Sequence, residues 1–424
     1  MQSRLSPILS MFTAVCGSVL WAAVGAARLK ADDPNRPSTR PPTGRQLTPS
    51  LTFSAVVRVN LTPVPVRKLR VAVNRPFRIR PVGARRVIDR VERWPSTDVV
   101  ATADGFRIGR NRYRASRLEI IPDESPSIWV GRHQYRGIVR LYRQPEGKLI
   151  AVNEVPLEPY IASVVDGEMP LSFPAAARQA QAIVARTYAL FRIEQARHHP
   201  HFDLYATTRS QRYLGFQYRD ANGRRLAGES ASSRRIADLT KSMVCLDRGR
   251  LFATYYSAVC GGRTTAGSEV FPAAVLKSVP CDWCRESPLF RWMATLKKPE
   301  AVRSFRRYFA SQGKPFDGLV SFRPVCGGVS QRHPHFDVSD GANQYRVAAA
   351  DLRRRIFPSL LHSPRFTVRT DQEGLVFEGR GHGHGVGMCQ WGARGLALAG
   401  RDALQIIAHY YPGAQVVKLE ATQR

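Results

Sequence analysis

Alternating apolar and polar positions dominate the chain from about residue 51 to residue 153. Short runs such as FSAVVRVNL, FRIRPV and KLIAVN repeat with a period of two and are separated by turn residues, which is typical of antiparallel strands. Many of these runs carry arginine at alternate positions, so we expect the sheet to have one solvated basic face. This part of the chain is predicted to be rich in β-structure.

The pattern changes to helical spacing after Pro170. The stretch AAARQAQAIVARTYALFRIEQAR is rich in alanine, with apolar residues at helical intervals, and it predicts the longest helix of the protein. Ser172 is the expected N-cap and Pro174 suits the first turn, which leaves Glu168 in a loop just ahead of the helix.

Several shorter elements are predicted toward the C-terminus. A strand, LVFEG, leads into the glycine-alternating loop GRGHGHGVG, and helices are expected at 299–311, 390–399 and 403–411. Together the patterns predict an α+β fold with two lobes. It combines an antiparallel β-rich N-terminal part, a long central helix and a C-terminal part made of a strand, a glycine loop and helices.

The N-terminus indicates export. Arg4 precedes an apolar run over residues 8–27, and charged, proline-rich sequence follows it. We expect a signal peptide or membrane anchor over residues 1–31 and a Pro/Arg-rich tether over 32–50. A β-rich part over 51–153 and a main domain over 154–424 would then lie in the periplasm, in the cell wall or on the outer face of the cytoplasmic membrane.

The charge balance adds a preference for acidic partners. The chain has 64 Lys and Arg against 33 Asp and Glu, a formal net charge of +31, which attracts polyanions. Anionic wall polymers or a membrane surface fit this charge. Nucleic acid is disfavoured, because the chain has no zinc-finger pattern, no aromatic RNA-binding signature and no basic region that leads into heptads.

Glu168 is the candidate for acid chemistry. Cleavage of a glycosidic bond needs a proton donor, and a carboxyl group kept neutral near pH 7 can supply one. Apolar neighbours, among them Val164, Val165 and Met169, favour the neutral form, whereas a helix start favours the ionised form. The direction of the pKa shift stays open at this stage, and so does a plain capping role for Glu168.

A conventional glycoside hydrolase needs a second carboxylate across the scissile bond. The sequence offers four candidates and does not choose between them: Glu154, Glu158, Asp166 and Asp203. A lytic mechanism needs one carboxyl group only, because the 6-hydroxyl of the sugar can act as the nucleophile.

The glycine-alternating loop allows the backbone to approach a ligand or another strand closely. It fits neither nucleotide-binding glycine motif. His382 and His384 point the same way if the loop is extended, and each is a candidate to hydrogen-bond a sugar, shuttle a proton, bind a metal or simply pack.

Cysteines outside the N-terminal segment are six in number: Cys245, Cys260, Cys281, Cys284, Cys326 and Cys389. An even count in an exported protein suggests disulfides. The pair Cys281-x-x-Cys284 together with Cys260 is alternatively a candidate zinc site. No cofactor is certain, and zinc is the possible one.

Four ordered motifs carry a family resemblance: NEVPLEPYIASVVDGEMPLSFPAAARQAQAIVARTYAL, FDLYATTRSQRYLG, YYSAVCGGRTTAGSEVF and FEGRGHGHGVGMCQWGARGLALAGRDALQIIAHYYPGAQV. The sequence resembles the SpoIID/LytB family over nearly all of the chain after the tether. The resemblance implies a lytic transglycosylase that cleaves peptidoglycan strands between MurNAc and GlcNAc after amidases have removed the stem peptides. Glu168 falls on the catalytic glutamate of the EMP motif.

The resemblance also suggests substrate contacts by Gln179, Arg186, His382, His384 and Gln390. The family commonly has tryptophan where this chain has His382 and a small residue where it has Cys389. Zinc in some members is held by Cys and His near the GGxT segment, where only Cys260 is available here. A related branch enhances a partner N-acetylmuramoyl-L-alanine amidase without cleaving glycan, and a simple wall-polysaccharide binding module is a further alternative.

Overall fold

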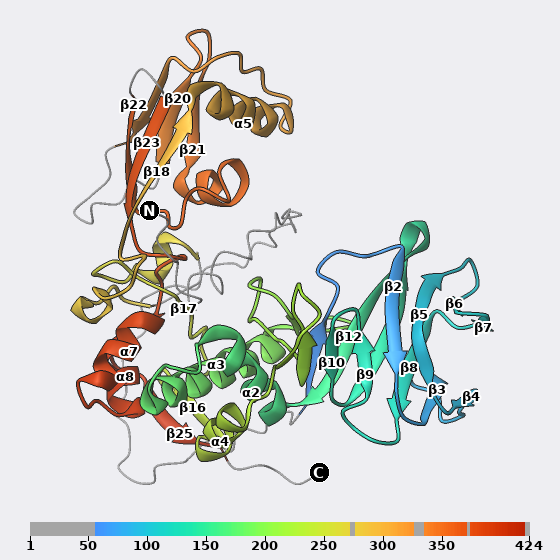
Figure 1. Cartoon of the computed structure of the whole chain (residues 1–424). Coiled ribbons are helices and arrows are strands. Elements are labelled where there is room, and N and C mark those ends of the chain that lie inside the picture. The colour runs from blue at the N-terminus through green and yellow to red at the C-terminus, as the bar shows by residue number, and fades with distance from the viewer. Residues whose placement is uncertain (1–55, 272–275, 326–334, 371–373, 420–424) are drawn as a thin grey trace, which may run out of the picture. The chain divides into compact units, whose positions relative to one another are not determined.

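The computed structural model describes residues 56–271, 276–325, 335–370 and 374–419 (Figure 1). The expected signal or anchor over 1–31, the tether over 32–50 and Cys326 lie outside these residues. In the described ranges, every helix is too short or too polar to cross a membrane. The described residues form two compact units, Arg291–Arg380 and the remainder up to Phe290 and from Gly381 onward.

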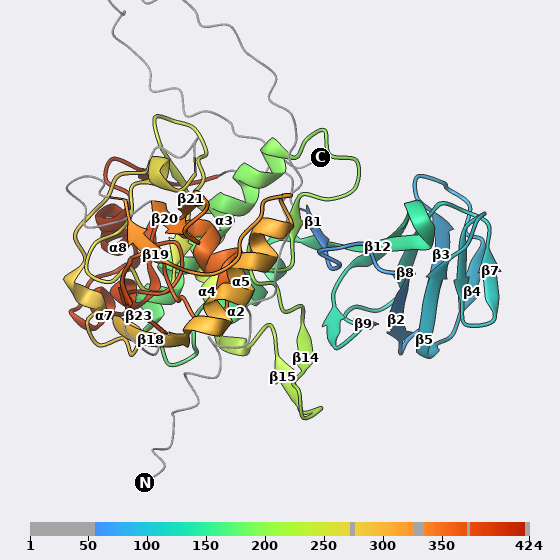
Figure 2. The same cartoon turned by 90° about the horizontal axis from the view of Figure 1, so that it is seen from above.

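Two mainly antiparallel sheets build the first part of the larger unit, as the alternating pattern predicts (Figure 2). Alternate side chains such as Val71, Val73, Leu118 and Leu141 are buried between them. The first sheet has the order β13(Leu204–Tyr205), β1(Val56–Asn60), β12(Lys148–Pro156), β11(Ile138–Gln144), β8(Arg117–Pro122), β3(Phe77–Pro81), β4(Asp89–Val91). The second has the order β15(Arg225–Ala227), β14(Gln217–Arg219), β10(His133–Tyr135), β9(Ile128–Val130), β2(Lys68–Val73), β5(Trp94–Ala101), β6(Phe106–Ile108), β7(Asn111–Tyr113).

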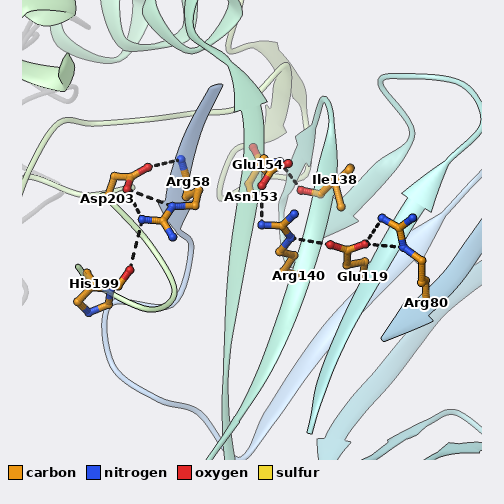
Figure 3. Close-up of polar contacts among 9 residues, drawn as sticks. All are labelled: Arg58, Arg80, Glu119, Ile138, Arg140, Asn153, Glu154, His199 and Asp203. Carbon is orange, nitrogen blue, oxygen red and sulfur yellow. Dashed lines mark hydrogen bonds and ion pairs between the residues drawn. The ribbon is translucent and has the colours of Figure 1, made fainter. Parts of the chain in front are cut away.

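Strand arginines such as Arg70, Arg107 and Arg143 are exposed, as the predicted basic face requires, whereas Arg80 and Arg140 pair with acidic residues. Glu119, which is buried, lies between Arg80 and Arg140 at 2.5 and 2.9 Å, and Arg140 also pairs with Glu154 at 2.6 Å (Figure 3). Arg80 and Arg140 are paired because acidic residues on neighbouring strands share the face on which they lie. The arginines thus hold strands β3, β8, β11 and β12 together.

Helices and short strands make up the rest of the larger unit. The predicted long helix is α3, the longest of the described helices with 21 residues. Pro174 is its N-cap residue and no side chain caps it, so the prediction for the exposed Ser172 is wrong. Gly167 and Glu168 lie in helix α2, which was not predicted from the sequence. The helices are α2(Leu157–Glu168), α3(Ala175–Gln195), α4(Ala231–Leu239), α7(Gln390–Leu398) and α8(Ala403–Tyr410), and the short strands are β16(Met243–Leu246), β17(Tyr256–Ser257), β24(Met388–Cys389) and β25(Gln415–Lys418).

The smaller unit has its own core, in which phenylalanines such as Phe305, Phe309, Phe336 and Phe377 pack together. Its predicted helix and its LVFEG strand are confirmed as α5 and β23. The elements are β18(Arg291–Lys297), α5(Lys298–Ala310), β19(Ser321–Pro324), β20(His335–Ser339), β21(Gln344–Ala348), α6(Ala349–Asp351), a π-helical turn at Leu352–Ile356, β22(Phe366–Thr370) and β23(Gly374–Arg380). The fold class is therefore α+β, as predicted. The boundary expected at residues 153 and 154 falls inside β12.

The glycine-alternating loop approaches another part of the backbone, as its composition predicts. A Cβ atom at Gly387 would lie 1.8 Å from the carbonyl oxygen of Tyr255, and one at Gly381 would lie 2.4 Å from that of Val259. His382 and Val259 exchange two backbone hydrogen bonds, and strand β17 pairs in parallel with β24. The loop is thereby fixed against residues 255–259.

Candidate functional site around Glu168

Glu168 is the last residue of helix α2, not a loop residue ahead of a helix. The apolar residues Leu157, Ile161 and Val165 recur at four-residue intervals and predict this helix in retrospect, because a proline in its first turn is tolerated. Pro170 then favours extended backbone at Met169, where the helix ends. The carboxyl group of Glu168 thus lies at the negative end of the helix dipole, which disfavours its ionised form.

The carboxyl group of Glu168 is held by three other segments. Its Oε1 accepts a hydrogen bond from the backbone N–H of Arg212 at 2.7 Å. The side chains of Tyr256 and Gln390 lie near it and act as donors that favour its ionised form. Gly167 makes the approach of Arg212 possible, since a Cβ atom there would lie 2.2 Å from the carbonyl oxygen of Arg212.

Enclosure of this carboxyl group raises the pKa of Glu168. Glu168 keeps part of its surface exposed, but its carboxyl group is surrounded by protein atoms. Burial is the largest influence and favours the neutral form; the Arg212 backbone and charge, Tyr256 and Gln390 oppose it without cancelling it. The direction that the sequence left open is therefore upward, as a general acid requires.

This pKa shift predicts a pH-dependent effect of Glu168→Gln on stability. The folded chain binds the Glu168 proton more tightly than the unfolded chain does, so ionisation costs stability as pH rises from the unfolded pKa of about 4.3 through the raised folded pKa. Glutamine does not ionise. The free energy of unfolding of the variant minus that of the native protein should therefore increase with pH across this window. Urea unfolding at a series of pH values measures it, and a difference that falls as pH rises contradicts the shift.

Gln211 and Tyr256, which were not singled out from the sequence, link Glu168 to the buried core. Tyr160 donates to Gln211 Oε1 at 3.0 Å, and Gln211 Nε2 donates to the hydroxyl of Tyr256 at 3.1 Å. Tyr256 in turn contacts Glu168. Gln211 and Tyr256 stand in two of the motifs that carry the family resemblance, and this position was the signal that could have identified them as site residues. Their side chains alone gave no reason to assign them to the site.

Gln390 lies beside Glu168, and a glutamine of α3 accompanies it. Gln390 Nε2 donates to Oε1 of the buried Gln181 at 3.3 Å. Gln181 Nε2 is buried without a hydrogen-bond partner among the described residues. Gln179 is two positions earlier on the helix, about 200° around its axis, and is partly exposed.

Arg186 is placed in the interior. It is completely buried, and its Nε and Nη2 donate to Glu158 at 3.1 and 2.6 Å. Its Nη1 donates to the carbonyl oxygen of Met243 at 3.1 Å. These bonds connect helices α2 and α3 with the segment at β16, so we leave Arg186 out of the residues proposed to touch substrate.

The two loop histidines have different surroundings. The ring of His384 packs edge-on against Phe271, with centroids 5.3 Å apart, and its Nδ1 accepts from the backbone N–H of Val386 at 3.0 Å. His382 is bound through its backbone to Val259. Both side chains are partly exposed.

Each of the four candidates for a second carboxylate has an ion-pair partner. Glu154 pairs with Arg140, and Asp203 pairs with Arg58 at 2.5 Å (Figure 3). Glu158 pairs with Arg186, and Asp166 is bound by Arg178, the Ser230 backbone and Ser233. All four carboxylates are therefore held in ion pairs.

Four of the five described cysteines lie together. The Sγ atoms of Cys260, Cys281, Cys284 and Cys389 are all within 4.8 Å of one another. None of the five described cysteines is bonded to another. The predicted group of Cys260, Cys281 and Cys284 thus gains Cys389 as a fourth member, which the sequence analysis missed because it looked for a second CxxC pair.

Fold and site together define a mixed α+β protein in which several segments of the chain surround the carboxyl group of one glutamate. The family model described as "Stage II sporulation protein" (SpoIID) matches residues 145–245, which include Glu168. The chain belongs to the SpoIID family. Membership of this family and the similarity to an amidase enhancer indicate a function related to the cell wall. A second family model, of a domain of unknown function, matches residues 267–387 and spans the whole smaller unit.

Three relatives indicate the range of this similarity. An uncharacterized protein of Brachyspira hyodysenteriae is 32% identical over 271 residues, which cover 63% of this chain and 68% of that protein. Stage II sporulation protein D of Bacillus subtilis is 27% identical over 281 residues, covering 64% and 77%. An amidase enhancer of Bacillus subtilis is 25% identical over 300 residues, covering 60% of this chain and 39% of the enhancer.

Proposed function

We propose that this protein is exported and acts as a lytic transglycosylase on the glycan strands of peptidoglycan from which stem peptides have been removed. The observation that carries the proposal is the enclosed carboxyl group of Glu168, whose pKa is raised chiefly by burial and which lies within the family match. The ion pairs of the four other carboxylates favour a mechanism that needs one acid.

In this mechanism Glu168 acts first as an acid and then as a base. Its carboxyl proton passes to the oxygen that joins C1 of MurNAc to GlcNAc, and the C1–O bond breaks. The 6-hydroxyl oxygen of the same MurNAc attacks C1, and the Glu168 carboxylate accepts the proton of that hydroxyl. The products are a GlcNAc end and a 1,6-anhydro-MurNAc end, no water is consumed, and Glu168 regains its proton.

We propose that Gln390, which lies beside Glu168, supplies a polar contact to the sugar and that the buried Gln181 orients it. His382, His384 and Gln179, which are partly exposed, are further candidates for substrate contacts. The net charge of +31 would hold the protein near anionic wall polymers or a membrane surface.

A second candidate function is the binding and stimulation of an N-acetylmuramoyl-L-alanine amidase without glycan cleavage. The similarity to an amidase enhancer favours it. In that case Glu168 would be needed for the fold or for glycan binding and not for bond cleavage.

Mass spectrometry of glycan strands separates the two functions. Peptide-bearing and amidase-stripped strands are incubated with the purified protein, and the ends of the fragments are identified. We expect 1,6-anhydro ends from the stripped strands. Binding of the strands without any new ends, together with faster peptide release when an amidase is added, would favour the enhancer.

A further inference from the structure

The four clustered cysteines come from separate parts of the chain. Cys260 follows strand β17, and Cys281 precedes the 3₁₀ turn Asp282–Cys284, which ends at Cys284. Cys389 ends strand β24 immediately before helix α7. All four are at most 3% exposed. The fold therefore brings together residues up to 129 positions apart to form one buried group of thiols.

The spacing of these thiols suits a metal ion. Tetrahedral zinc with Zn–S bonds of about 2.3 Å keeps its sulfur atoms about 3.8 Å apart. Cys260 Sγ and Cys284 Sγ are 3.7 Å apart, and all four sulfurs lie within 4.8 Å of one another. A disulfide needs about 2.05 Å, and an iron–sulfur cluster needs space for several iron and sulfide ions between its cysteines. The distances favour one ion.

Hydrogen-bond donors around the sulfurs favour thiolates. The backbone N–H groups of Cys260 and Gly392 each donate to Cys389 Sγ at 3.3 Å, so this sulfur caps the N-terminus of α7. The hydroxyl of Tyr410 lies 3.1 Å from Cys281 Sγ. Such outer contacts orient metal ligands and stabilise their negative charge.

The packing around the group leaves little freedom. A Cβ atom at Gly392 would lie 2.0 Å from the Tyr410 hydroxyl and 2.5 Å from Cys281 Sγ. Glycine at this position therefore allows helix α7 to approach the cysteines. Cys245 is also buried in the same hydrophobic core but is not a member of the group.

We infer that Cys260, Cys281, Cys284 and Cys389 bind one structural zinc ion as a closed tetrathiolate site. Four protein ligands leave no open position, which is typical of structural zinc. The donor set contains no histidine and needs Cys389, so it differs from the Cys and His arrangement that the family resemblance suggested near the GGxT segment.

The zinc ion has a consequence for Glu168, which rests on the proposed function. Cys389 directly precedes Gln390, and Cys260 lies four residues after Tyr256. The side chains of Gln390 and Tyr256 both lie near the carboxyl group of Glu168. Zinc would join the two segments and keep both side chains in position, so its loss should also weaken any Glu168-dependent reaction.

Metal analysis of the purified protein tests the site without reference to activity. The protein is isolated without a metal-affinity step, and zinc is measured by plasma mass spectrometry. We expect about one zinc ion per chain, and near zero in Cys389→Ser and Cys281→Ser. The matched control is Cys245→Ser, which removes a buried thiol outside the group and should retain the zinc.

A second measurement, made on the native protein, tests the site even if the cysteine variants fail to fold. Replacement of zinc by cobalt in the native protein should give the absorption bands of a tetrahedral cobalt tetrathiolate. Metal-free protein with a Cys281–Cys284 disulfide would overturn the inference, as would zinc that persists in folded Cys389→Ser. Iron with the same cysteine dependence would overturn the assignment to zinc. Zinc binding without glycan cleavage would leave the site intact and reject only the proposed reaction.

Discussion

Replacing Glu168 with glutamine is expected to slow the release of 1,6-anhydro fragments from stripped glycan strands by about 10²–10⁴-fold, the usual contribution of general acid–base catalysis. Glutamine retains the size of the side chain and can still accept from the Arg212 backbone. It cannot give a proton to the departing oxygen. The rate of fragment release per folded molecule, measured by mass spectrometry, is the test.

The control for this prediction is Glu194→Gln. Glu194 is an exposed glutamate in the last turn of α3, and its replacement is the same chemical change at a position outside the site. We expect the fragment rate to be unchanged. Strand binding by Glu168→Gln should also persist, because the proposed glycan contact of Gln390 does not depend on the proton. Equal rates in the native protein and Glu168→Gln would reject Glu168 as the acid.

The elements with strong local patterns could be predicted from the sequence. Helix α3 has repeated apolar spacing over 21 residues, and strand β12 contains the short apolar run LIAV, so both have a pattern that is visible locally. Helix α2 was missed because its prolines resemble breakers, although Pro159 stands in the first turn, where proline is tolerated. The error mattered, because it reversed the helix end on which Glu168 lies.

The surroundings of Glu168 depend on contacts that local patterns do not contain. Arg212 is 44 positions away and reaches the carboxyl group through its backbone, which any residue except proline can supply. Cys389 likewise joins cysteines more than a hundred positions earlier. Such partners depend on the tertiary fold. The motifs that contain Glu168, Gln390 and the CxxC pair, by contrast, can be recognised in the sequence itself.

Loss of Arg186 is expected to destabilise the fold instead of weakening substrate contact. In Arg186→Met the carboxylate of Glu158, which is 20% exposed, remains in place without its partner. Breaking a buried pair in this way costs about 3–5 kcal/mol, so the free energy of unfolding in urea should fall by an amount near the lower end of that range.

The double variant Arg186→Met with Glu158→Leu separates the two roles of Arg186. It removes both charges, so no buried carboxylate is left unpaired, and replacement of a whole buried pair by apolar residues is often close to neutral. We expect it to recover most of the lost stability and to bind stripped glycan strands as the native protein does. A double variant that is stable but has lost glycan binding would instead assign Arg186 to the substrate, which would require its guanidinium to leave Glu158 and the Met243 carbonyl when glycan binds.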